Sequence, residues 1–347
     1  MHPTLRTRHP LILSKRDIGG GRDTWLMRSG DDYWRSCAGA AAVKGVLAPP
    51  PGEPGIAPLP ALADAQSDGG APVRLARYAV DRAVADLVRH VWVPRWQLPA
   101  GVVVEQGVLE YPSANLVIEA DAAALYGPEL GRGHQRLEGA GWAFGALLQP
   151  GVARRLVTVP MRGLIGGSVP LQQLRVTDAT GLARDVRVAV EAGDDAVAVA
   201  AFEAWLAAQA LVVDDDARLV RHVVELAEDD RTILRAEDLA DASGVGLRTL
   251  QRLVRDQLGL TPKWLIRRYR MQEAAAALAA PDTPSLADLA AQLGFTDQAH
   301  LTREFRAVIG ETPRRYALAA AAARHPSSQP AAPAAVSADE ARLGSPG

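Results

Sequence analysis

An internal repeat between residues 218 and 317 constrains the fold of this chain more than any other feature of its sequence. In both copies an Asp-Leu-Ala tripeptide precedes a glycine, and a Leu-x-Arg segment precedes a Gly-x-Thr-Pro motif. The first copy contains Asp238-Leu239-Ala240, Gly244, Leu250-Gln251-Arg252 and Gly259-Leu260-Thr261-Pro262, and the second contains Asp288-Leu289-Ala290, Gly294, Leu301-Thr302-Arg303 and Gly310-Glu311-Thr312-Pro313. Self-similarity at one spacing indicates that a single supersecondary unit occurs twice.

Each copy has the pattern of a helix-turn-helix. Gly244 and Gly294 each follow a short helical segment, and glycine adopts the left-handed turn conformation that other residues avoid. A second helix then crosses the first. We expect these second helices near 247–258 and 298–309, where apolar residues recur at helical spacing: Leu250, Val254 and Leu258 in the first copy, and Leu301, Phe305, Val308 and Ile309 in the second.

The opposite faces of these two helices carry residue types that read DNA bases. The spacing i, i+3, i+4, i+7 is occupied by Arg248, Gln251, Arg252 and Arg255, and again by Ala299, Thr302, Arg303 and Arg306. Arginine bonds guanine and glutamine bonds adenine in bidentate fashion, each worth roughly 1–3 kcal/mol of discrimination. Thr249, His300 and Thr302 suit phosphate or thymine-methyl contacts. A solvated helix face is the simpler interpretation of any one of these side chains, but two aligned copies favour two recognition helices.

Local charge also favours a DNA-binding surface, although the whole chain carries a formal net charge of -2. Between residues 247 and 270 there is one acid, Asp256, against seven basic residues, which leaves a surplus of six: Arg248, Arg252, Arg255, Lys263, Arg267, Arg268 and Arg270. Such a surplus is typical of surfaces that contact phosphates.

One rigid helix is predicted to join the two motifs. The segment from Pro262 to Ala280 has no internal Gly or Pro, and Pro281 and Pro284 end it. At about 1.5 Å per residue it spans roughly 28 Å, close to the roughly 34 Å between successive major-groove faces on one side of B-DNA. We therefore expect a single monomer to read two adjacent major grooves.

The repeat resembles the C-terminal DNA-binding domain of the AraC/XylS family. Segments 289–295, 301–306 and 310–316 are similar to that family's signature. The resemblance implies a transcription regulator, more commonly an activator, that binds double-stranded promoter DNA and contacts RNA polymerase. A single cysteine and the lack of a candidate membrane span or signal peptide lead us to expect a cytoplasmic protein. It also implies base-reading residues early in each recognition helix, here Arg248, Gln251 and Arg252, and then Gln298, Ala299, Thr302 and Arg303.

Two positions depart from the family pattern. Ala299 stands where a polar or larger side chain is usual, so the second helix is expected to read fewer bases, through Gln298 and Arg303. Gly246 begins the first recognition helix where a serine cap is common, at a cost of a few tenths of a kcal/mol. Sequence discrimination is therefore expected to depend mainly on the first helix, from Arg248 to Arg252.

Upstream of the repeat, residues 73–170 predict a mostly β domain. Short segments rich in Val, Leu, Tyr and Trp alternate with Gly and Pro at His90 to Val93, Val102 to Glu105, Leu116 to Glu119, Trp142 to Leu148 and Leu156 to Pro160. This region resembles an uncharacterised domain often found ahead of AraC-type domains, which implies a sensing or dimerising role. A pocket lined by aromatic and amide side chains is one hypothesis, against the commoner role of such residues in core packing: Trp92, Trp96, Tyr111, Asn115 and Trp142.

The other segments predict connections and tails, so the expected fold class is an α+β multidomain chain. Residues 1–72 read as disordered, or as translated from a start codon placed too far upstream, and residues 318–347 read as a disordered tail. Residues 171–213 are expected to be a helical linker region, with Val197, Ala201, Trp205 and Ala208 on one face. That face is favoured as an internal packing surface over a homodimer contact.

Composition and motifs offer little support for the main alternative, a DNA-binding module fused to an enzyme or to a protein-interaction domain. The single cysteine, Cys37, excludes an intramolecular disulfide and a cysteine-based zinc site. The seven histidines are scattered, and neither a catalytic triad order nor a phosphate-binding loop occurs. No apolar run is long enough for a membrane span. We therefore expect no catalysis, no metal and no cofactor, with a small-molecule effector and a homodimer as open hypotheses.

Overall fold

The computed structural model describes residues 63–64, 73–108, 111–131 and 133–324. All of them belong to the larger of the two parts into which the chain divides, Cys37–Gly347. The predictions made for Cys37, for most of residues 1–72 and for residues 325–347 lie outside the described residues. Within the described part, no helix is long and apolar enough to cross a membrane.

The N-terminal domain is built on a seven-stranded sheet with the strand order β1-β2-β3-β8-β5-β6-β9, beside a two-stranded hairpin of β4 and β7. The neighbouring strands are antiparallel except for β1 and β2. The strands are β1 (Ala63–Asp64), β2 (Val73–Tyr78), β3 (Val88–Gln97), β4 (Val103–Val108), β5 (Asn115–Glu119), β6 (Ala123–Tyr126), β7 (Gly133–Glu138), β8 (Ala140–Leu148) and β9 (Ser168–Pro170). The predicted mostly β domain is therefore present.

One predicted strand is wrong. Leu156 to Pro160 forms no β-strand. The helix α2 (Ala153–Leu156) ends at the first residue of this segment, and the short 3-10 helix η1 (Met161–Leu164) follows it. Leu156 and Val157 are both fully buried. A short apolar run marks a buried segment without deciding whether it is helix or strand.

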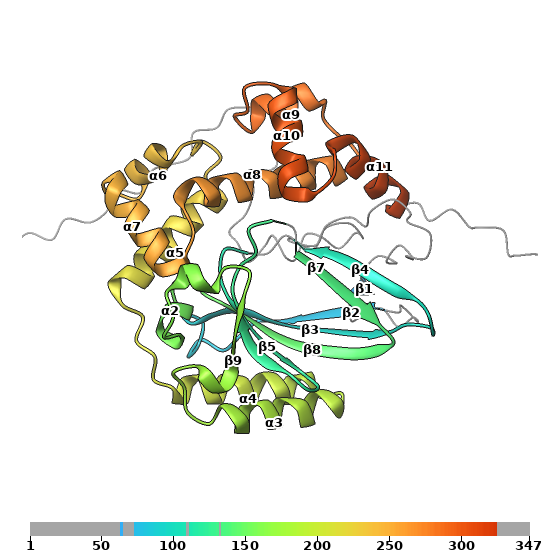
Figure 1. Cartoon of the computed structure of the whole chain (residues 1–347), viewed down its shortest axis with the longest axis vertical. Helices are drawn as coiled ribbons and strands as arrows, with labels where there is room; N and C mark the ends of the chain where they lie inside the picture. Colours follow the sequence, from blue (N-terminus) through green and yellow to red (C-terminus); the bar gives the residue numbers. More distant parts are fainter. Residues whose placement is uncertain (1–62, 65–72, 109–110, 132, 325–347) are drawn as a thin grey trace, which may run out of the picture. The chain divides into compact units, whose positions relative to one another are not determined.

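Two helices cover one face of the sheet, α3 (Ala179–Glu191) and α4 (Asp195–Ala208), after the short η2 (Leu171–Gln173) (Figure 1). Val186 and Phe202 share a core with Phe144 of β8 and Ile118 of β5. Residues 171–213 are thus part of the N-terminal domain's core and more than the connection that their sequence predicts. Burying the apolar side of both helices is what stabilises this arrangement.

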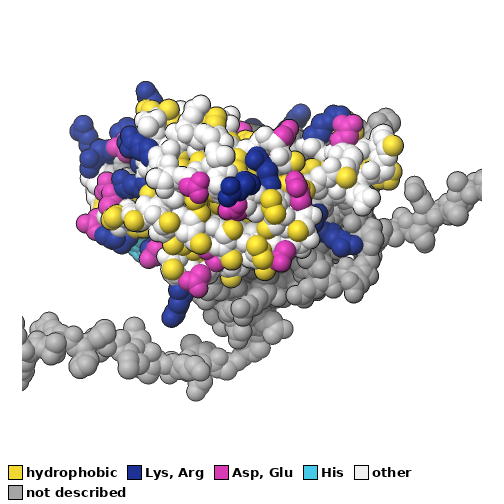
Figure 2. Space-filling model, turned by 90° about the horizontal axis from the view of Figure 1, so that it is seen from below, with side chains coloured by type: hydrophobic (Ala, Val, Ile, Leu, Met, Phe, Trp, Pro, Cys, Tyr) yellow, Lys and Arg dark blue, Asp and Glu magenta, His cyan; other side chains and the backbone are white. Residues whose placement is uncertain are grey.

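The buried side of α4 also differs from prediction. Trp205 is buried as expected, but Val197 is 53% exposed, while Ala198 and Phe202 face the core. Most residues of α4 are Ala or Val, so apolar periodicity does not mark a single side. In Figure 2, which views the molecule from the side of α3 and α4 in Figure 1, hydrophobic side chains are interspersed with charged ones.

A polar contact joins α4 to the sheet. The Tyr78 hydroxyl on β2 donates to Asp195 Oδ2 at 2.8 Å, and Arg95 on β3 pairs with the same carboxylate. Arg95 Nη2 also donates to the Val190 carbonyl at 2.8 Å, at the end of α3. Burial, followed by the hydrogen bond to Asp195, raises the pKa of Tyr78 to about 12.

The hypothetical aromatic pocket is not assembled. Trp92 and Trp96 pack over Gly145 and Gly141 of β8, and the Trp92 Nε1 donates to Asn115 Oδ1 at 3.2 Å. Trp142 is paired with Arg95, and Arg95 lies three positions after Trp92 on the same strand. Because side chains alternate between the faces of a sheet, Trp142 lies on the face opposite to Trp92. Trp92, Trp96 and Trp142 thus pack within the domain, as the alternative interpretation favoured, whereas Tyr111 contacts Tyr269 of the C-terminal domain.

The C-terminal domain is all α, and both helix-turn-helix motifs lie where the repeat predicts them (Figure 1). The first unit contains α5 (Asp215–Asp229), α6 (Ala236–Ala242) and α7 (Leu247–Leu258). The second unit contains α9 (Leu286–Gln292), α10 (Gln298–Ile309) and α11 (Pro313–Arg324), and α8 (Pro262–Ala279) joins the two units. α11 continues past Ala317, where the sequence predicts that the tail begins. Tyr316 and Ala320 are buried in the core of the second unit, which explains the longer helix.

Replacing Gly145 with Ala should destabilise the N-terminal domain. The added Cβ would lie 2.0 Å from Cε2 of Trp92, and overpacking of this kind costs about 1–3 kcal/mol. Gly163→Ala is the control, because its Cβ would meet nothing within 4 Å. Chemical denaturation of both variants measures the difference, and equal losses would contradict the packing of Trp92 on Gly145.

Candidate nucleic-acid interface

The first recognition helix, α7, is preceded by a turn that requires glycine. Gly244 has φ +70, and a Cβ added there would meet nothing within 4 Å. Gly246 is the N-cap and makes no side-chain hydrogen bond. The predicted absence of a cap is thus observed. Leu250, Val254 and Leu258 are buried, so the helix presents its other side to solvent.

The second recognition helix, α10, also follows a glycine turn, and unlike α7 it has a side-chain N-cap. Gly294 has φ +72, and Asp297 caps the helix by accepting from the His300 backbone N–H at 2.7 Å. A side-chain cap of this kind stabilises a helix by about 1 kcal/mol. Leu301 and Phe305 are fully buried beneath it.

Most of the predicted DNA-binding residues lie on the solvent side of α7 and α10. The exposed ones are Arg248, Thr249, Gln251, Arg252 and Arg255 on α7, and Gln298, Ala299 and Arg303 on α10. Among the described residues, Arg248, Arg252 and Arg303 form no ion pair, whereas Arg255 contacts the neighbouring Asp256 at 3.4 Å. The two polar faces are therefore accessible to a ligand.

Two predicted contact residues on α10 are half-buried and have local partners. The His300 ring packs edge-on against Phe295, with centroids 5.3 Å apart. The Thr302 hydroxyl donates to the Gln298 carbonyl at 2.8 Å, which leaves its oxygen able to accept. The side chain of His300 thus helps to build the turn, and α10 offers fewer polar groups than α7.

The predicted basic surplus is overestimated, because two of its seven members are buried and a third, which is half-exposed, is held in an ion pair. Arg268 and Arg270 are 1% and 5% exposed. Arg267 pairs with Glu304 of α10 at 2.5 Å. Arg248, Arg252, Arg255 and Lys263 remain exposed. The sequence signal that could have distinguished Arg267, Arg268 and Arg270 from the exposed residues is their position inside α8. Both units pack against this joining helix, so much of its surface is covered.

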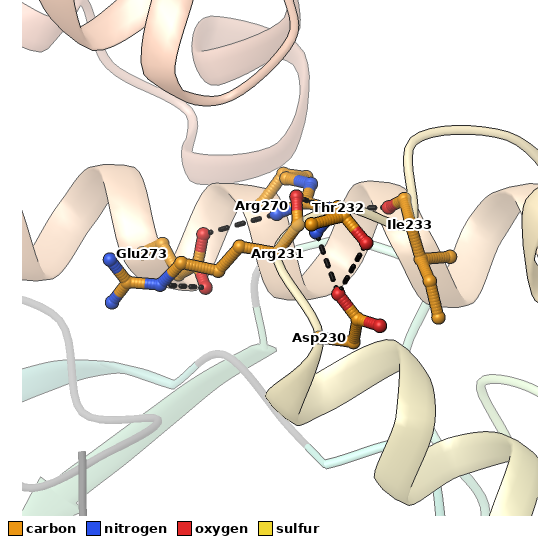
Figure 3. Close-up of polar contacts among 6 residues, drawn as sticks. All are labelled: Asp230, Arg231, Thr232, Ile233, Arg270 and Glu273. Carbon is orange, nitrogen blue, oxygen red and sulfur yellow. Dashed lines mark hydrogen bonds and ion pairs between the residues drawn. The ribbon is translucent and has the colours of Figure 1, made fainter. Parts of the chain in front are cut away.

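Arg270 fixes the loop between α5 and α6 onto α8 (Figure 3). Its Nη2 donates to the carbonyls of Arg231, at 2.9 Å, and Ile233. Glu273 Oε2 lies 3.4 Å from Arg270 Nη1, and Glu273 Oε1 lies 3.3 Å from Arg231. One buried guanidinium thus holds the loop that leads into the first helix-turn-helix.

The same loop is ordered by Asp230, which accepts from the backbone N–H of Thr232 at 2.8 Å and from its hydroxyl at 2.6 Å (Figure 3). These hydrogen bonds lower the pKa of Asp230. Together these contacts hold residues 230–233, the part of the loop that follows α5.

The joining helix α8 has the predicted bounds to within one residue. Thr261 caps it by accepting from the Trp264 backbone N–H at 3.2 Å, Pro262 is its first residue, and Ala280 is its C-cap. Its 18 residues span about 27 Å. One uninterrupted helix thus sets the separation of α7 and α10.

Other exposed basic residues flank the second recognition helix: Arg306 belongs to its predicted polar face, whereas Arg314 and Arg315 were not among the predicted contact residues. Arg306 lies at the end of α10, and Arg314 and Arg315 lie at the start of α11. The signal that could have identified Arg314 and Arg315 is their place directly after the repeated Gly-x-Thr-Pro motif. They extend the basic surface beyond the helices themselves.

Comparisons with known families support both halves of the chain. Residues 239–319 match a family described as "Helix-turn-helix domain". Residues 76–170 match "Domain of unknown function (DUF6597)". These matches confirm the predicted resemblances of the C-terminal and N-terminal domains.

Curated relatives align with the C-terminal region. The chain is 34% identical over 101 residues to "HTH-type transcriptional activator RhaS" of Citrobacter koseri, which covers 29% of this chain and 36% of that protein. It is 34% identical over 124 residues to "Transcriptional activator NphR" of Rhodococcus sp, which covers 35% of this chain and 36% of that protein. The chain thus matches little more than a third of the length of either relative.

Solved structures also match. A transcriptional regulator with an AraC-type DNA-binding domain from Chromobacterium violaceum is 26% identical, with 30% of this chain and 93% of that chain covered and a TM-score of 0.28. ToxT from Vibrio cholerae is 11% identical, with 71% and 97% covered and a TM-score of 0.34. Because both TM-scores are low, the domain assignment rests on the sequence matches.

Replacing Arg270 with Met should destabilise the first unit. Two backbone carbonyls and Glu273 would lose their buried donor, at a cost of about 3 kcal/mol. Arg231→Gln is the control: its side chain is 60% exposed and contacts the same Glu273, so about 1 kcal/mol or less is expected. Urea denaturation followed by circular dichroism measures both, and similar losses would contradict the special role of Arg270.

Proposed function

We propose that this chain, whose C-terminal domain is an AraC-type helix-turn-helix domain, is a sequence-specific DNA-binding transcription regulator that acts as an activator. It reads two adjacent major grooves with α7 and α10. The observation that carries this function is the repetition itself: two amphipathic helices with exposed polar faces, joined by one continuous helix. The activator role follows RhaS and NphR, which are described as transcriptional activators.

The predicted contact residues have separate roles in this proposal. Guanidinium and amide groups are assigned to base edges, because they form bidentate bonds with guanine and adenine: Arg248, Gln251 and Arg252 on α7, and Gln298 and Arg303 on α10. Hydroxyl and remaining basic groups are assigned to phosphates: Thr249, Arg255 and Thr302. Ala299 offers only a methyl group, which suits a thymine methyl.

The two helices contribute unequally. On α7 the polar side chains Arg248, Gln251 and Arg252 are exposed. On α10, Ala299 has no hydrogen-bonding group and His300 packs on Phe295. Base discrimination therefore depends more on the groove that α7 occupies.

The N-terminal domain regulates the C-terminal one in this scheme, through a small-molecule effector, a second copy of the chain, or both. RNA polymerase is the partner at the promoter, and no catalytic step is assigned to the chain. Effector binding and protein interaction are distinguished by thermal-shift screening of the full chain, since an effector raises the melting temperature of the domain that binds it. The packing of Trp92 and Trp96 on glycines favours interaction through the domain surface.

Replacing Arg252 or Arg303 with Ala should weaken binding to the specific site by about 10- to 100-fold, since a bidentate base contact is worth roughly 1–3 kcal/mol. Binding to random DNA should change much less. The matched control is Arg184→Ala, because Arg184 is an exposed arginine of the N-terminal domain and its loss should not affect DNA binding. Titrations with both DNAs at one salt concentration measure this, and equal losses on both would mean that the arginines contact only phosphates.

Footprinting of the full chain at limiting concentration should protect two major-groove faces about one helical turn, roughly 34 Å, apart. The span of α8 makes this spacing accessible to one monomer. Protection of one groove only would contradict the role of α8 as a rigid joining helix.

A further inference from the structure

A buried ion pair connects the N-terminal domain to the first helix-turn-helix unit. Arg89 on β3 donates from Nη1 and Nη2 to Glu228 on α5, at 3.1 Å and 3.2 Å. The Tyr111 hydroxyl donates to the same carboxylate at 2.7 Å. The side chains of Arg89 and Glu228 are only 20% and 5% exposed. A carboxylate this buried depends on its partners, because an unpaired charge in this position is costly.

Aromatic rings extend this contact. The Arg89 guanidinium lies 4.1 Å from the centroid of the Tyr111 ring. Tyr111 in turn packs edge-on against Tyr269 of α8, with centroids 6.1 Å apart. The N-terminal domain therefore contacts both α5 and α8.

A second set of contacts lies between α8 and the loop of residues 128–131. Arg268 donates to the carbonyls of Glu129 and Gly131 at 3.1 Å and 3.0 Å. Trp264 Nε1 donates to the Leu130 carbonyl at 3.3 Å. Arg268 is 1% exposed, so its guanidinium is buried beneath the loop to which it donates.

The end of the recognition helix α7 forms a third contact. Gly259 has φ +76, and a Cβ added there would lie 2.6 Å from the Met161 carbonyl oxygen of η1. Glycine is needed both for the backbone conformation and for this close approach. The reading helix thus ends directly on the N-terminal domain.

The second unit is built differently. Its hydrophobic core consists of described residues between Met271 and Ala320, all from the segment α8 to α11. The core of the first unit, by contrast, includes Tyr111 and Ile165 of the N-terminal domain among its packed neighbours. The N-terminal domain therefore packs into the core of one unit of the pair.

We propose that Arg89, Tyr111 and Glu228, together with the contact of Gly259 on Met161, form a latch that fixes the N-terminal domain to the first helix-turn-helix unit. A change in the N-terminal domain reaches DNA through this latch, by altering how α7 meets its groove while α10 keeps its own contacts. The DNA part of this statement rests on the proposed function. The latch itself is measurable without DNA.

Hydrogen–deuterium exchange of the full chain tests the latch. In Glu228→Gln, amide exchange in residues 127–131 and 161–166 should rise by about tenfold or more, because the buried pair loses its charge. Glu225→Gln makes the same chemical change at an exposed position of α5 and should leave exchange unchanged. Equal exchange in both variants would overturn the latch.

A glycine pair provides an independent test. Gly259→Ala and Gly244→Ala both place alanine at positive φ, but only the first meets the backbone of Met161 and Arg162. Exchange in residues 161–166 should rise in Gly259→Ala alone. A similar rise in Gly244→Ala would mean that helix-end strain, and no domain contact, is responsible.

Footprinting tests the route to DNA. The half of the site lost in Arg252→Ala identifies the groove of the first unit, and Glu228→Gln should change protection in that half and leave the other half within about twofold. Equal changes in both halves would overturn the route while leaving the latch intact. Absence of any specific site would contradict the proposed function, and the exchange result would stand by itself.

Discussion

Helix α8 supplies side chains to two hydrophobic cores, and the rest of the C-terminal domain depends on this sharing. Leu265, Ile266 and Tyr269 pack in the first unit, whereas Met271, Ala274 and Leu278 pack in the second. Because neither unit is complete without its part of the helix, the separation of the two units is determined by helix geometry. A flexible connection would leave this separation undefined.

Burial on several sides of α8 also changes what its arginines do. Arg268 and Arg270 lie within the same basic cluster as Arg252, yet they donate to backbone carbonyls of loops packed against the helix. Buried carbonyls need donors, and a guanidinium can satisfy two at once. Composition alone cannot separate an arginine that holds a loop from one that meets a phosphate, since the difference lies in the neighbours that tertiary packing brings.

The N-terminal domain shows the same limit. Its strands follow from β-branched and aromatic segments, and four of the five predicted strand regions are strands. The fifth is a buried helix end, and the helices α3 and α4 belong to the core of the domain. Local patterning marks apolar segments, but which sheet face an alanine-rich helix covers depends on partners far away in the sequence.

The sequence by itself determined the repeat, the bounds of both recognition helices and the exposed faces that carry Arg252 and Arg303, because helical periodicity and glycine turns are local properties. It could not distinguish Gly259 from Gly310, which occupy the same motif and both have positive φ. Only the tertiary structure places Gly259 against Met161, and Glu228 against Arg89. These pairs are distant in sequence, so packing between domains makes the two copies of the repeat physically unequal.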